Sequence, residues 1–457
     1  MSQVIAAAAD LNAPPVTKTL ADFVSTHPSQ GWSAEVEHEA HRTFLNWLGC
    51  AIGAAQHESV TSSLAAVQEF QPAPQASILG RKERVDMGGA ALINGISSHT
   101  FDFDDTHLKT VIHPAGPVAS AILALGEHIN TNGRQIIDAM VLGIDVECRV
   151  GNAMYPDHYH RGWHITGSTG MLGSAAACAR ILGLDTHKTM MALGIAASQP
   201  IGMREQFGTM TKPFHPGGAA RAGQMSALLA KHGFTASLRA LEAGRGYMQT
   251  VSTKNDWSEI DRDLGKSFEI SLNTYKPFAC GIVIHPAIDA CAQLRAQGVK
   301  ADEVERIELR VHPLVLELTG KKTPKTGLEG KFSVYHGCAM GLIFGQAGES
   351  EYADDIVNRP DVVALRAKVN ATTDSAISEA SVDVKAILKN GKEVHVFVKN
   401  AIGSVKNPMS DTNLEQKFTS LAEPIIGKQK TAQLISALWN LGKAADLKQI
   451  IQLSTPN

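Results

Sequence analysis

The sequence has few aromatic residues and no closely spaced cysteine pairs, and each absence excludes a class of protein. Aromatic residues make up 5% of the 457 positions, whereas glycine alone occupies 40. This composition favours helices that pack closely through small residues. The cysteines form no Cys-x-x-Cys pair, so the sequence supports neither a zinc ribbon nor a clustered iron–sulfur site. We expect free, mostly buried thiols in a reducing compartment; the six cysteines are Cys50, Cys148, Cys178, Cys280, Cys291 and Cys338.

Long apolar runs, basic clusters and a positively charged N-terminus are also missing. No stretch reaches 18 uninterrupted apolar residues, so we expect no membrane-spanning helix and no membrane partner. The first 15 residues carry no lysine or arginine, which is atypical of a secretory signal and favours a cytoplasmic protein. The net charge is 42 − 45 = −3 without a long Lys/Arg run, so we expect no nucleic-acid partner.

The hydrophobic pattern divides the chain into two kinds of region. Apolar and small residues recur with helical spacing through about residue 265. Val304 to His312 then alternates apolar and charged residues, which predicts a half-buried strand. Residues 381–388 and 393–398 flank Asn390-Gly391, a strong hairpin signal. We therefore predict a mainly α fold in which a large helical domain (1–268 plus 403–457) carries an inserted, smaller α+β domain (269–402).

One acidic stretch stands out between two apolar helical segments. It runs from Phe101 to His107 and continues to His113-Pro114, and it contains Asp102, Asp104 and Asp105. Three carboxylates this close repel one another unless cationic or proton-bearing groups compensate them. A second interpretation is a solvated acidic turn whose aspartates cap a helix and whose His-Pro pair begins the next one.

Two further segments invite ligand-binding interpretations. Histidines 158, 160 and 164 have a spacing that could serve a metal, but Gly162 and the neighbouring aromatic residues indicate a loop. The segment Gly167-x-x-Gly170-x-x-Gly173 superficially matches a dinucleotide-binding fingerprint. It lacks a preceding strand, so helix–helix packing is the better interpretation.

Two Lys-Pro pairs stand at predicted helix entries. Lys212 precedes a proline and should be extended, with Gly217 and Gly218 opening a helix whose N–H groups could receive a carboxylate. Arg221 would follow one turn later, and Lys276 begins the second Lys-Pro pair. Either lysine could be an ordinary surface residue. Together with the acids and histidines, they suit a small anionic substrate and proton transfer next to a carboxylate.

Six motifs occur in order along almost the whole chain, and together they resemble the MmgE/PrpD family. They are FDFDDTH…HPAG, RGWHITGSTG, MTKPFHPGGAARAG, YKPFACG, GKFSVYHGCA and GSVKNPMS. The family includes 2-methylcitrate dehydratases, cis-aconitate decarboxylases and iminodisuccinate epimerases. The resemblance implies a helical domain built from both chain ends, an inserted α+β lid, and a homodimer without a metal or organic cofactor.

The resemblance also implies roles for individual residues. The functional residues of the decarboxylase branch fall on Asp102, Thr106, His113, His164, Lys212, Lys276 and Tyr335. Two features depart from that branch. Gly281 stands where the decarboxylases have a histidine, and the spacing from Thr106 to His113 is one residue longer. Both departures argue against decarboxylation and leave the residues for proton transfer in place.

We therefore expect a cofactor-independent lyase or isomerase that acts on a small di- or tricarboxylate. Its candidate catalytic residues are Asp102, His113, His164, Lys212 and Tyr335; its candidate substrate-binding residues are Thr106, Lys212, Arg221 and Lys276. Dehydration of the 2-methylcitrate type is the leading reaction, epimerisation of the iminodisuccinate type is the alternative, and cis-aconitate decarboxylation comes third. Two other classes stay open: a metal-dependent hydrolase built on the histidines at 158, 160 and 164, and a non-catalytic binding protein.

Overall fold

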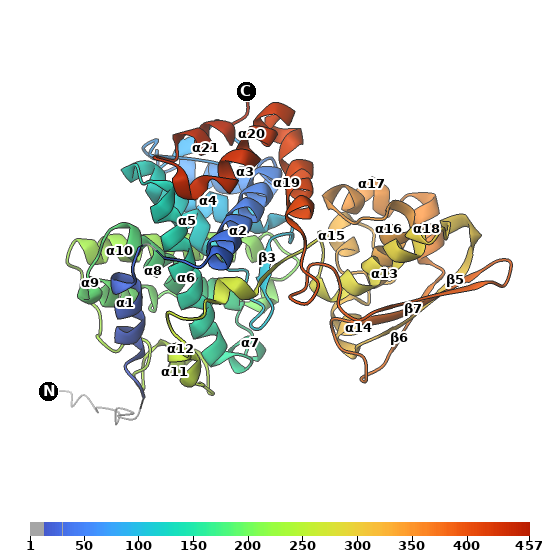
Figure 1. The fold of residues 1–457 in the computed structure, drawn as a ribbon, viewed down its shortest axis with the longest axis horizontal. Coiled ribbons are helices and arrows are strands. Elements are labelled where there is room, and N and C mark those ends of the chain that lie inside the picture. Colours follow the sequence, from blue (N-terminus) through green and yellow to red (C-terminus); the bar gives the residue numbers. More distant parts are fainter. Residues whose placement is uncertain (1–12, 30) are drawn as a thin grey trace. The chain divides into compact units, whose positions relative to one another are not determined.

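The computed structural model describes residues 13–29 and 31–457 (Figure 1). Their contacts divide the chain into two units. The first contains the described residues up to Thr100 together with Asp104–Asn273 and Leu414–Asn457; the second contains Phe101–Phe103 and Thr274–Asn413. We expected the changes of domain at 268/269 and 402/403, whereas the units change at 273/274 and 413/414. Within the described ranges, no helix is long and apolar enough to cross a membrane.

The first unit is almost entirely helical, as predicted. Its α-helices are α1 (Val16–Thr26), α2 (Ala34–Gly53), α3 (Glu58–Gln68), α4 (Met87–Thr100), α5 (Ala115–Ile129), α6 (Gly133–Met154), α7 (Asp157–His160), α8 (Ile165–Ile181), α9 (Thr186–Ala196), α10 (Thr211–Lys231), α11 (Tyr247–Val251), α12 (Ser258–Asp261), α19 (Asp411–Ile426), α20 (Lys428–Trp439) and α21 (Lys448–Leu453). Its strands are β1 (Ala76–Ser77), β2 (Arg84–Val85) and β3 (Asp105–His107), and β4 (Asn273–Tyr275) spans the change of unit. Short 3-10 turns lie at η1 (Arg204–Gln206), η2 (Glu269–Leu272) and η6 (Leu441–Lys443).

Glycines bring the central helices of this unit into backbone contact. A Cβ on Gly95 of α4 would lie 2.5 Å from the Cα of Gly217 on α10, and one on Gly223 would lie 2.4 Å from the Ser174 Cβ on α8. Only residues without side chains allow such approach. In α8, a Cβ on Gly170 would lie 2.5 Å from the Cγ of Pro117. The glycine spacing of α8 therefore serves helix packing, as predicted.

One local prediction is wrong. Helix α10 begins at Thr211, so Lys212 is helical rather than extended, and Gly217 and Gly218 lie inside the helix instead of opening it. Pro213 is compatible with the first turn because the N–H groups there have no intrahelical acceptor. Gly217 is a close-contact residue: a Cβ there would lie 2.3 Å from the carbonyl oxygen of Leu92. Its N–H therefore does not belong to an anion-binding helix end.

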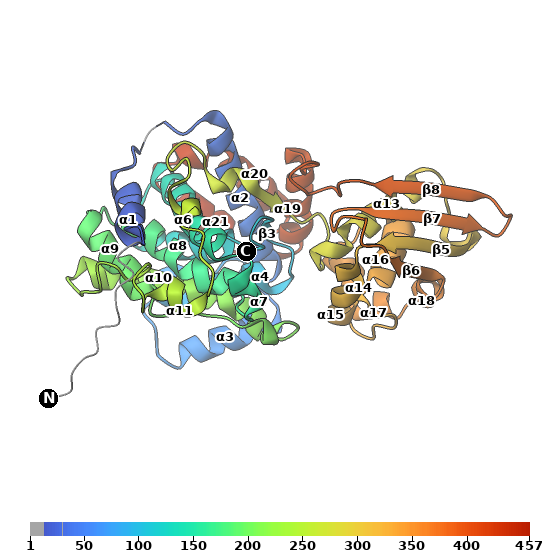
Figure 2. The ribbon, with the colours of Figure 1, turned by 90° about the horizontal axis from the view of Figure 1, so that it is seen from below.

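The second unit is an α+β structure, as predicted. Its four-stranded sheet has the order β6-β5-β7-β8, with β5 parallel to β6 and antiparallel to β7 (Figure 2). The strands are β5 (Val304–Val311), β6 (Val369–Thr373), β7 (Val382–Leu388) and β8 (Glu393–Val398). The Asn390-Gly391 hairpin is confirmed between β7 and β8, with Gly391 at a φ of +81°.

Helices cover this sheet through small residues as well. Helix α13 packs against β7, β8 and α16, and a Cβ on Gly341 of α16 would lie 2.4 Å from the Ile288 carbonyl oxygen of α13. The α-helices are α13 (His285–Ala296), α14 (Pro313–Thr319), α15 (Gly327–Gly330), α16 (Val334–Phe344), α17 (Asp354–Val357) and α18 (Pro360–Arg366); the 3-10 turns are η3 (Ile282–Ile284), η4 (Ala301–Glu303) and η5 (Glu349–Tyr352).

Candidate active site

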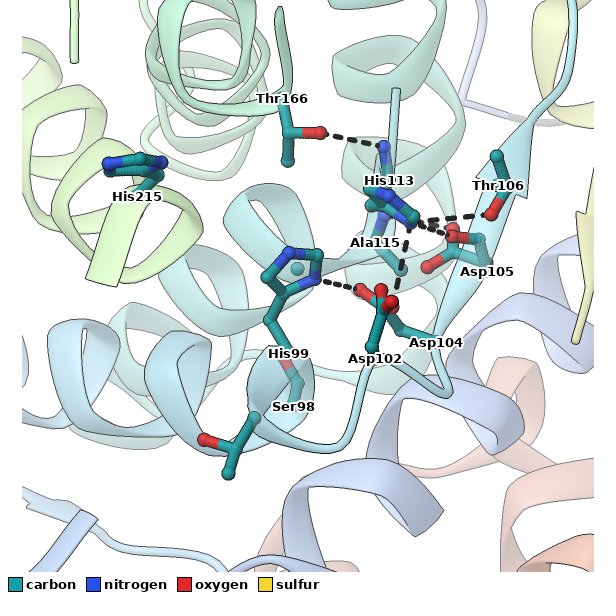
Figure 3. A network of polar contacts seen from close by, with 12 residues as sticks. Ser98, His99, Asp102, Asp104, Asp105, Thr106, His113, Ala115, Thr166 and His215 are labelled. Carbon is teal, nitrogen blue, oxygen red and sulfur yellow. Dashed lines mark hydrogen bonds and ion pairs between the residues drawn. The ribbon is translucent and has the colours of Figure 1, made fainter. Parts of the chain in front are cut away.

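Four helix ends of the first unit bring a group of histidines together (Figure 3). His99 lies in the last turn of α4, His113 just before α5, His164 at the N-cap of α8 and His215 near the start of α10. One ring nitrogen of each of His99, His113 and His164 lies within 4.8 Å of the others, and all three residues are buried. We call His99, His113, His164 and His215 the histidine cluster. Sequence reasoning identified His113 and His164 as site residues, and the structure brings them together.

Two buried aspartates fix one side of the histidine cluster. The Nδ1 of His99 lies 2.6 Å from Asp104 Oδ2, and both side chains are fully buried. The Nδ1 of His113 lies 2.6 Å from the backbone oxygen of Asp105 and 3.5 Å from Asp104 Oδ1. Asp105 accepts from the N–H of Ala115 and the amide of Asn273. Asp105 thus accepts from the first N–H of α5 without being its N-cap residue, and both aspartates are buried, unlike the solvated turn of the second interpretation.

Thr106 and Thr166 hold His113 from other directions. The Thr106 hydroxyl oxygen lies 3.3 Å from the Nδ1 of His113, and the backbone N–H of His113 donates to the Thr166 hydroxyl at 3.1 Å (Figure 3). Thr166 belongs to the first turn of α8. These contacts fix the ring orientation of His113. Thr106, predicted as a substrate-binding residue, therefore lies beside His113 of the histidine cluster.

His164 and His215 form the other side of the cluster. Their Nδ1 atoms lie 2.9 Å apart, so one ring donates a hydrogen bond to the other. The ring of Phe207 packs edge-on against His164 with a centroid separation of 5.0 Å, and the Lys212 ammonium lies 5.4 Å from the centroid of the same phenyl ring. Lys212, a predicted site residue, is thereby placed beside His164.

Burial controls the protonation of these groups. It lowers the pKa of His164 well below the ordinary range, and the positive charges of His99, Lys212, His113 and His215 lower it further. Burial lowers the pKa of His215 to about 4, and the positive charges of His99 and Lys212 contribute to this shift. Burial and the charge of Asp104 raise the pKa of Asp105 to about 7. His164 and His215 are therefore neutral near pH 7, so either can accept a proton.

The start of three helices faces the histidine cluster. Helices α5, α8 and α10 begin at Ala115, Ile165 and Thr211, next to His113, His164 and Lys212. A helix N-terminus carries a partial positive charge, which favours bound anions, while the N–H groups of Ala115, Thr211 and Lys212 already donate to Asp105 and Thr209. With the ammonium of Lys212, this end of the first unit suits a substrate carboxylate placed beside proton-transfer groups.

Asp102 and Lys276 form an ion pair in the second unit. The Lys276 ammonium donates to the backbone oxygen of Asp102 at 3.0 Å and to its Oδ1 at 2.7 Å. Lys331 donates to the backbone oxygen of Phe101 and to Glu349. Asp102 has a φ of +53°, a strained conformation for a residue with a side chain. The two lysines therefore hold the loop residues Phe101 and Asp102 within this unit.

Tyr335 and Gly281 also belong to the second unit. Tyr335 lies on α16, where burial raises the pKa of its phenol, and the Lys322 ammonium lies 5.8 Å from its ring centroid. Gly281 has a φ of −56°, and a Cβ there would meet only ordinary contacts, 3.5 Å from the Thr319 Cγ2 and 3.6 Å from the Lys331 oxygen. The backbone at 281 thus accepts a side chain without strain.

Arg221 does not join the histidine cluster. It is exposed on α10, and its Cγ and Nε lie 3.8 Å from the position of a Cβ on Gly88. Gly88 is in the first turn of α4, whereas His99 is in the last turn. Along α4, more than two helical turns therefore separate Gly88, the residue beside Arg221, from His99.

The histidine spacing at 158, 160 and 164 does not form a metal site. His158 is buried, with its Nε2 2.7 Å from the Ser168 hydroxyl and its Nδ1 3.1 Å from the Val251 oxygen, while His160 is exposed. The loop indicated by Gly162 is confirmed, because α7 ends at His160 and Gly162 has a φ of +104°. Within the described ranges, the residues able to hold a metal are instead His99, His113 and His164.

Sequence reasoning missed His99 and His215. His99 ends a helix rich in small apolar residues and looks like part of its buried face. His215 stands in the run Pro213-Phe214-His215-Pro216, which resembles a loop. The available signal for His99 was its position five residues before Asp104, at the junction of a helix and an acidic turn. Only the packing of α4, α8 and α10 shows that both rings enter the cluster.

Comparisons with known proteins identify the family of this chain. The MmgE/PrpD N-terminal domain matches residues 18–260 and the MmgE/PrpD C-terminal domain matches residues 278–441. The cis-aconitate decarboxylase of Aspergillus terreus is 25% identical over 96% of this chain and 95% of its own length. The human cis-aconitate decarboxylase is 29% identical over 80% of this chain and 78% of its own. The 2-methylcitrate dehydratase of Escherichia coli K12 is 23% identical over 80% and 79%, respectively. Because both domains match in order and the first spans more than half of the chain, the protein belongs to the MmgE/PrpD family.

Proposed function

We propose that the protein is a lyase that acts on a small di- or tricarboxylate by moving a carbon-bound proton next to a carboxylate. The observation that carries this proposal is the buried histidine cluster at the starts of α5, α8 and α10. A proton on such a carbon is weakly acidic, so its removal needs a well-placed base and stabilisation of the resulting negative charge. The relatives named above include a decarboxylase and a dehydratase, both lyases.

The leading reaction is dehydration of the 2-methylcitrate type. In this proposal a neutral histidine of the cluster accepts the carbon-bound proton, and Lys212 with the three helix N-termini stabilises the charge on the substrate carboxylate. His164 and His113 are the bases predicted from the sequence, and the depressed pKa of His164 supports a neutral ring there. Thr106 fixes His113 and therefore the position of the accepting nitrogen.

Decarboxylation of cis-aconitate is a second candidate because the decarboxylases from Aspergillus terreus and human share 25% and 29% identity with this chain, against 23% for the dehydratase. The residue at 281 argues against it, since glycine replaces the histidine of that branch. Epimerisation of an iminodisuccinate-type substrate also fits a site that moves a carbon-bound proton. We further propose a homodimer without a resident cofactor, which light scattering and elemental analysis of the purified protein would test.

Proton NMR in heavy water separates these reactions. The protein would be incubated with 2-methylcitrate, citrate, cis-aconitate and iminodisuccinate in turn, and loss of a specific carbon-bound hydrogen signal would be followed. Appearance of an olefin from a hydroxy acid indicates dehydration, itaconate indicates decarboxylation, and a changed diastereomer without olefin indicates epimerisation. Binding of one of these acids without any exchange or turnover would contradict the proposed proton transfer.

A further inference from the structure

His99 has the geometry of a catalytic base, although its role is not implied by any of the sequence motifs. Its side chain is fully buried, and its Nδ1 contacts the equally buried Asp104 Oδ2 at 2.6 Å. Its Nε2 is also buried and has no hydrogen-bond partner among the described residues. Buried polar atoms are almost always paired, so an unpaired one in a polar cluster points to a missing ligand group.

The contact with Asp104 determines which nitrogen of His99 carries the proton. A carboxylate can only accept, so the Nδ1 of His99 must donate to it. In the neutral ring the Nε2 then has a free lone pair. When that Nε2 gains a proton, the Asp104 carboxylate stabilises the imidazolium, and the absence of solvent strengthens the effect.

His99 differs in this respect from its two neighbours. The Nδ1 of His113 is 2.6 Å from a backbone carbonyl and 3.5 Å from Asp104, so its closest acceptor is neutral. The Nδ1 of His164 contacts another imidazole, that of His215. The rings of His113 and His164 lie 4.8 and 5.7 Å from the His99 ring centroid. His99 therefore combines the closest carboxylate with a buried Nε2 that has no hydrogen-bond partner among the described residues.

We propose that the His99–Asp104 pair is the proton-accepting group of the site. This inference rests on the proposed function. In the dehydration direction, the His99 Nε2 takes the carbon-bound proton, and the C–H electron pair forms the double bond as the C–O bond breaks. The leaving hydroxyl departs as water with a proton from a second donor, for which the Lys212 ammonium is the candidate. Proton transfer from His99 back to that donor closes the cycle, so atoms and charge balance.

Two variants test the pair on the complete protein. His99→Gln removes the base, and we expect kcat and the rate of substrate hydrogen exchange to fall by about 100-fold or more, with KM within a few fold. Asp104→Asn keeps the base and removes its charge partner, so we expect a smaller loss of kcat and a changed pH profile. Retention of more than about a third of the wild-type exchange rate in His99→Gln would overturn the proposal.

A matched control comes from a second buried histidine–carboxylate pair in the same unit. The Nε2 of His107 lies 2.9 Å from Glu269, but its Nδ1 is also occupied, by the Thr110 hydroxyl at 2.7 Å. His107→Gln should lower thermal stability and leave kcat near the wild-type value. Equal losses of kcat in the two histidine variants would identify a purely structural effect and overturn the proposal. If His99→Gln fails to fold, Asp104→Asn tests the proposal instead: an unchanged kcat and an unchanged pH profile would overturn it.

A readout without substrate keeps the proposal separate from the proposed function. In protein labelled with ¹⁵N-histidine, NMR should show His99 with its proton on Nδ1 and an unprotonated Nε2, and Asp104→Asn should change that signal. A proton on Nε2 would overturn the proposal whatever the substrate is. If the tautomer is as expected but none of the four acids reacts, the proposed function fails, and the catalytic role of His99 fails with it, while the Nδ1–H tautomer set by Asp104 is established. Stoichiometric metal that is lost in His99→Gln would make His99 a ligand and overturn the proposal.

Discussion

Asp102 and Asp104 are two residues apart and belong to different units with opposite surroundings. In the second unit, Asp102 accepts from the ammonium of Lys276, a permanent cation, and its side chain is 15% exposed. In the first unit, Asp104 contacts the imidazole of His99, and both side chains are fully buried. The first pair suits holding a loop in place, while the second suits proton transfer.

This comparison shows that the density of acids alone does not assign their roles. All three aspartates lie within four consecutive residues, yet one is paired with lysine, one with histidine, and Asp105 accepts from the first N–H of α5. The partner, and whether it can change its charge, decides what each carboxylate does. Variants that remove one partner at a time should therefore have different kinds of effect in the two units.

The largest effect is expected from Lys212→Ala in the first unit. Loss of the ammonium beside His164 should lower kcat/KM by about 100-fold or more, because charge stabilisation of the intermediate is lost. A partly exposed lysine contributes about 1 kcal/mol or less to stability, so the thermal unfolding midpoint should barely move. The matched control is Lys231→Ala, at the exposed C-terminal end of the same helix. Near-normal turnover in Lys212→Ala would remove this residue from the proposed site.

Lys276→Met should act mainly on stability in the second unit. The Lys276 side chain is 4% exposed, so removal of its charge leaves the Asp102 carboxylate partly buried without its cation. We expect a loss of about 3 kcal/mol in the free energy of unfolding, measured with urea. Lys276→Met combined with Asp102→Asn should recover part of this loss in a double-mutant cycle. Full additivity of the two losses would show that the ion pair does not stabilise the loop.

Glu147 tests the effect of burial on a carboxyl without an ionic partner. Burial and the charge of Asp105 raise its pKa well above 4.5, and neither of its oxygens has a hydrogen-bond partner among the described residues. Above the unfolded pKa, the folded state keeps a proton that the unfolded state has released. Stability conferred by this group therefore falls as pH rises through that window.

Glu147→Gln should flatten this dependence. We expect a gain of about 1 kcal/mol in the free energy of unfolding at pH 8 and a smaller difference at pH 5. Urea unfolding at both pH values would measure it. Some slope should persist, because Asp105, with a pKa of about 7, changes stability in the same direction. An equal effect of the variant at both pH values would show that Glu147 does not titrate between them.

The smallest effect on stability is expected at Gly281. Since a Cβ there meets only ordinary contacts, Gly281→Ala should change the free energy of unfolding by less than about 1 kcal/mol. Gly281→His restores the residue type of the decarboxylase branch. If this side chain decides the reaction, Gly281→His should release CO2 from cis-aconitate and Gly281→Ala should not. Unfolding of the alanine variant would contradict the conclusion that position 281 has room for a side chain.

Much of the fold could be predicted from the sequence because its signals are local. The alternation from Val304 to His312 and the Asn390-Gly391 hairpin predict β5, β7 and β8 within a residue or two. The start of α10 was placed wrongly, because two glycines in sequence look like a helix opening. In the structure Gly217 lies against the backbone of α4, a contact between residues more than 100 positions apart that no local pattern contains.

The sequence by itself determined the family and the mainly α fold with its α+β unit. It also placed His113, His164 and Lys212 among the site residues, because each lies in a recognisable motif. Only the tertiary structure decided that His99 and His215 join them, that Asp102 pairs with Lys276, and that Arg221 lies elsewhere. The physical reason is that spacing along the chain fixes local conformation. The protonation and partners of a side chain depend on burial and on helix ends brought together by long-range packing.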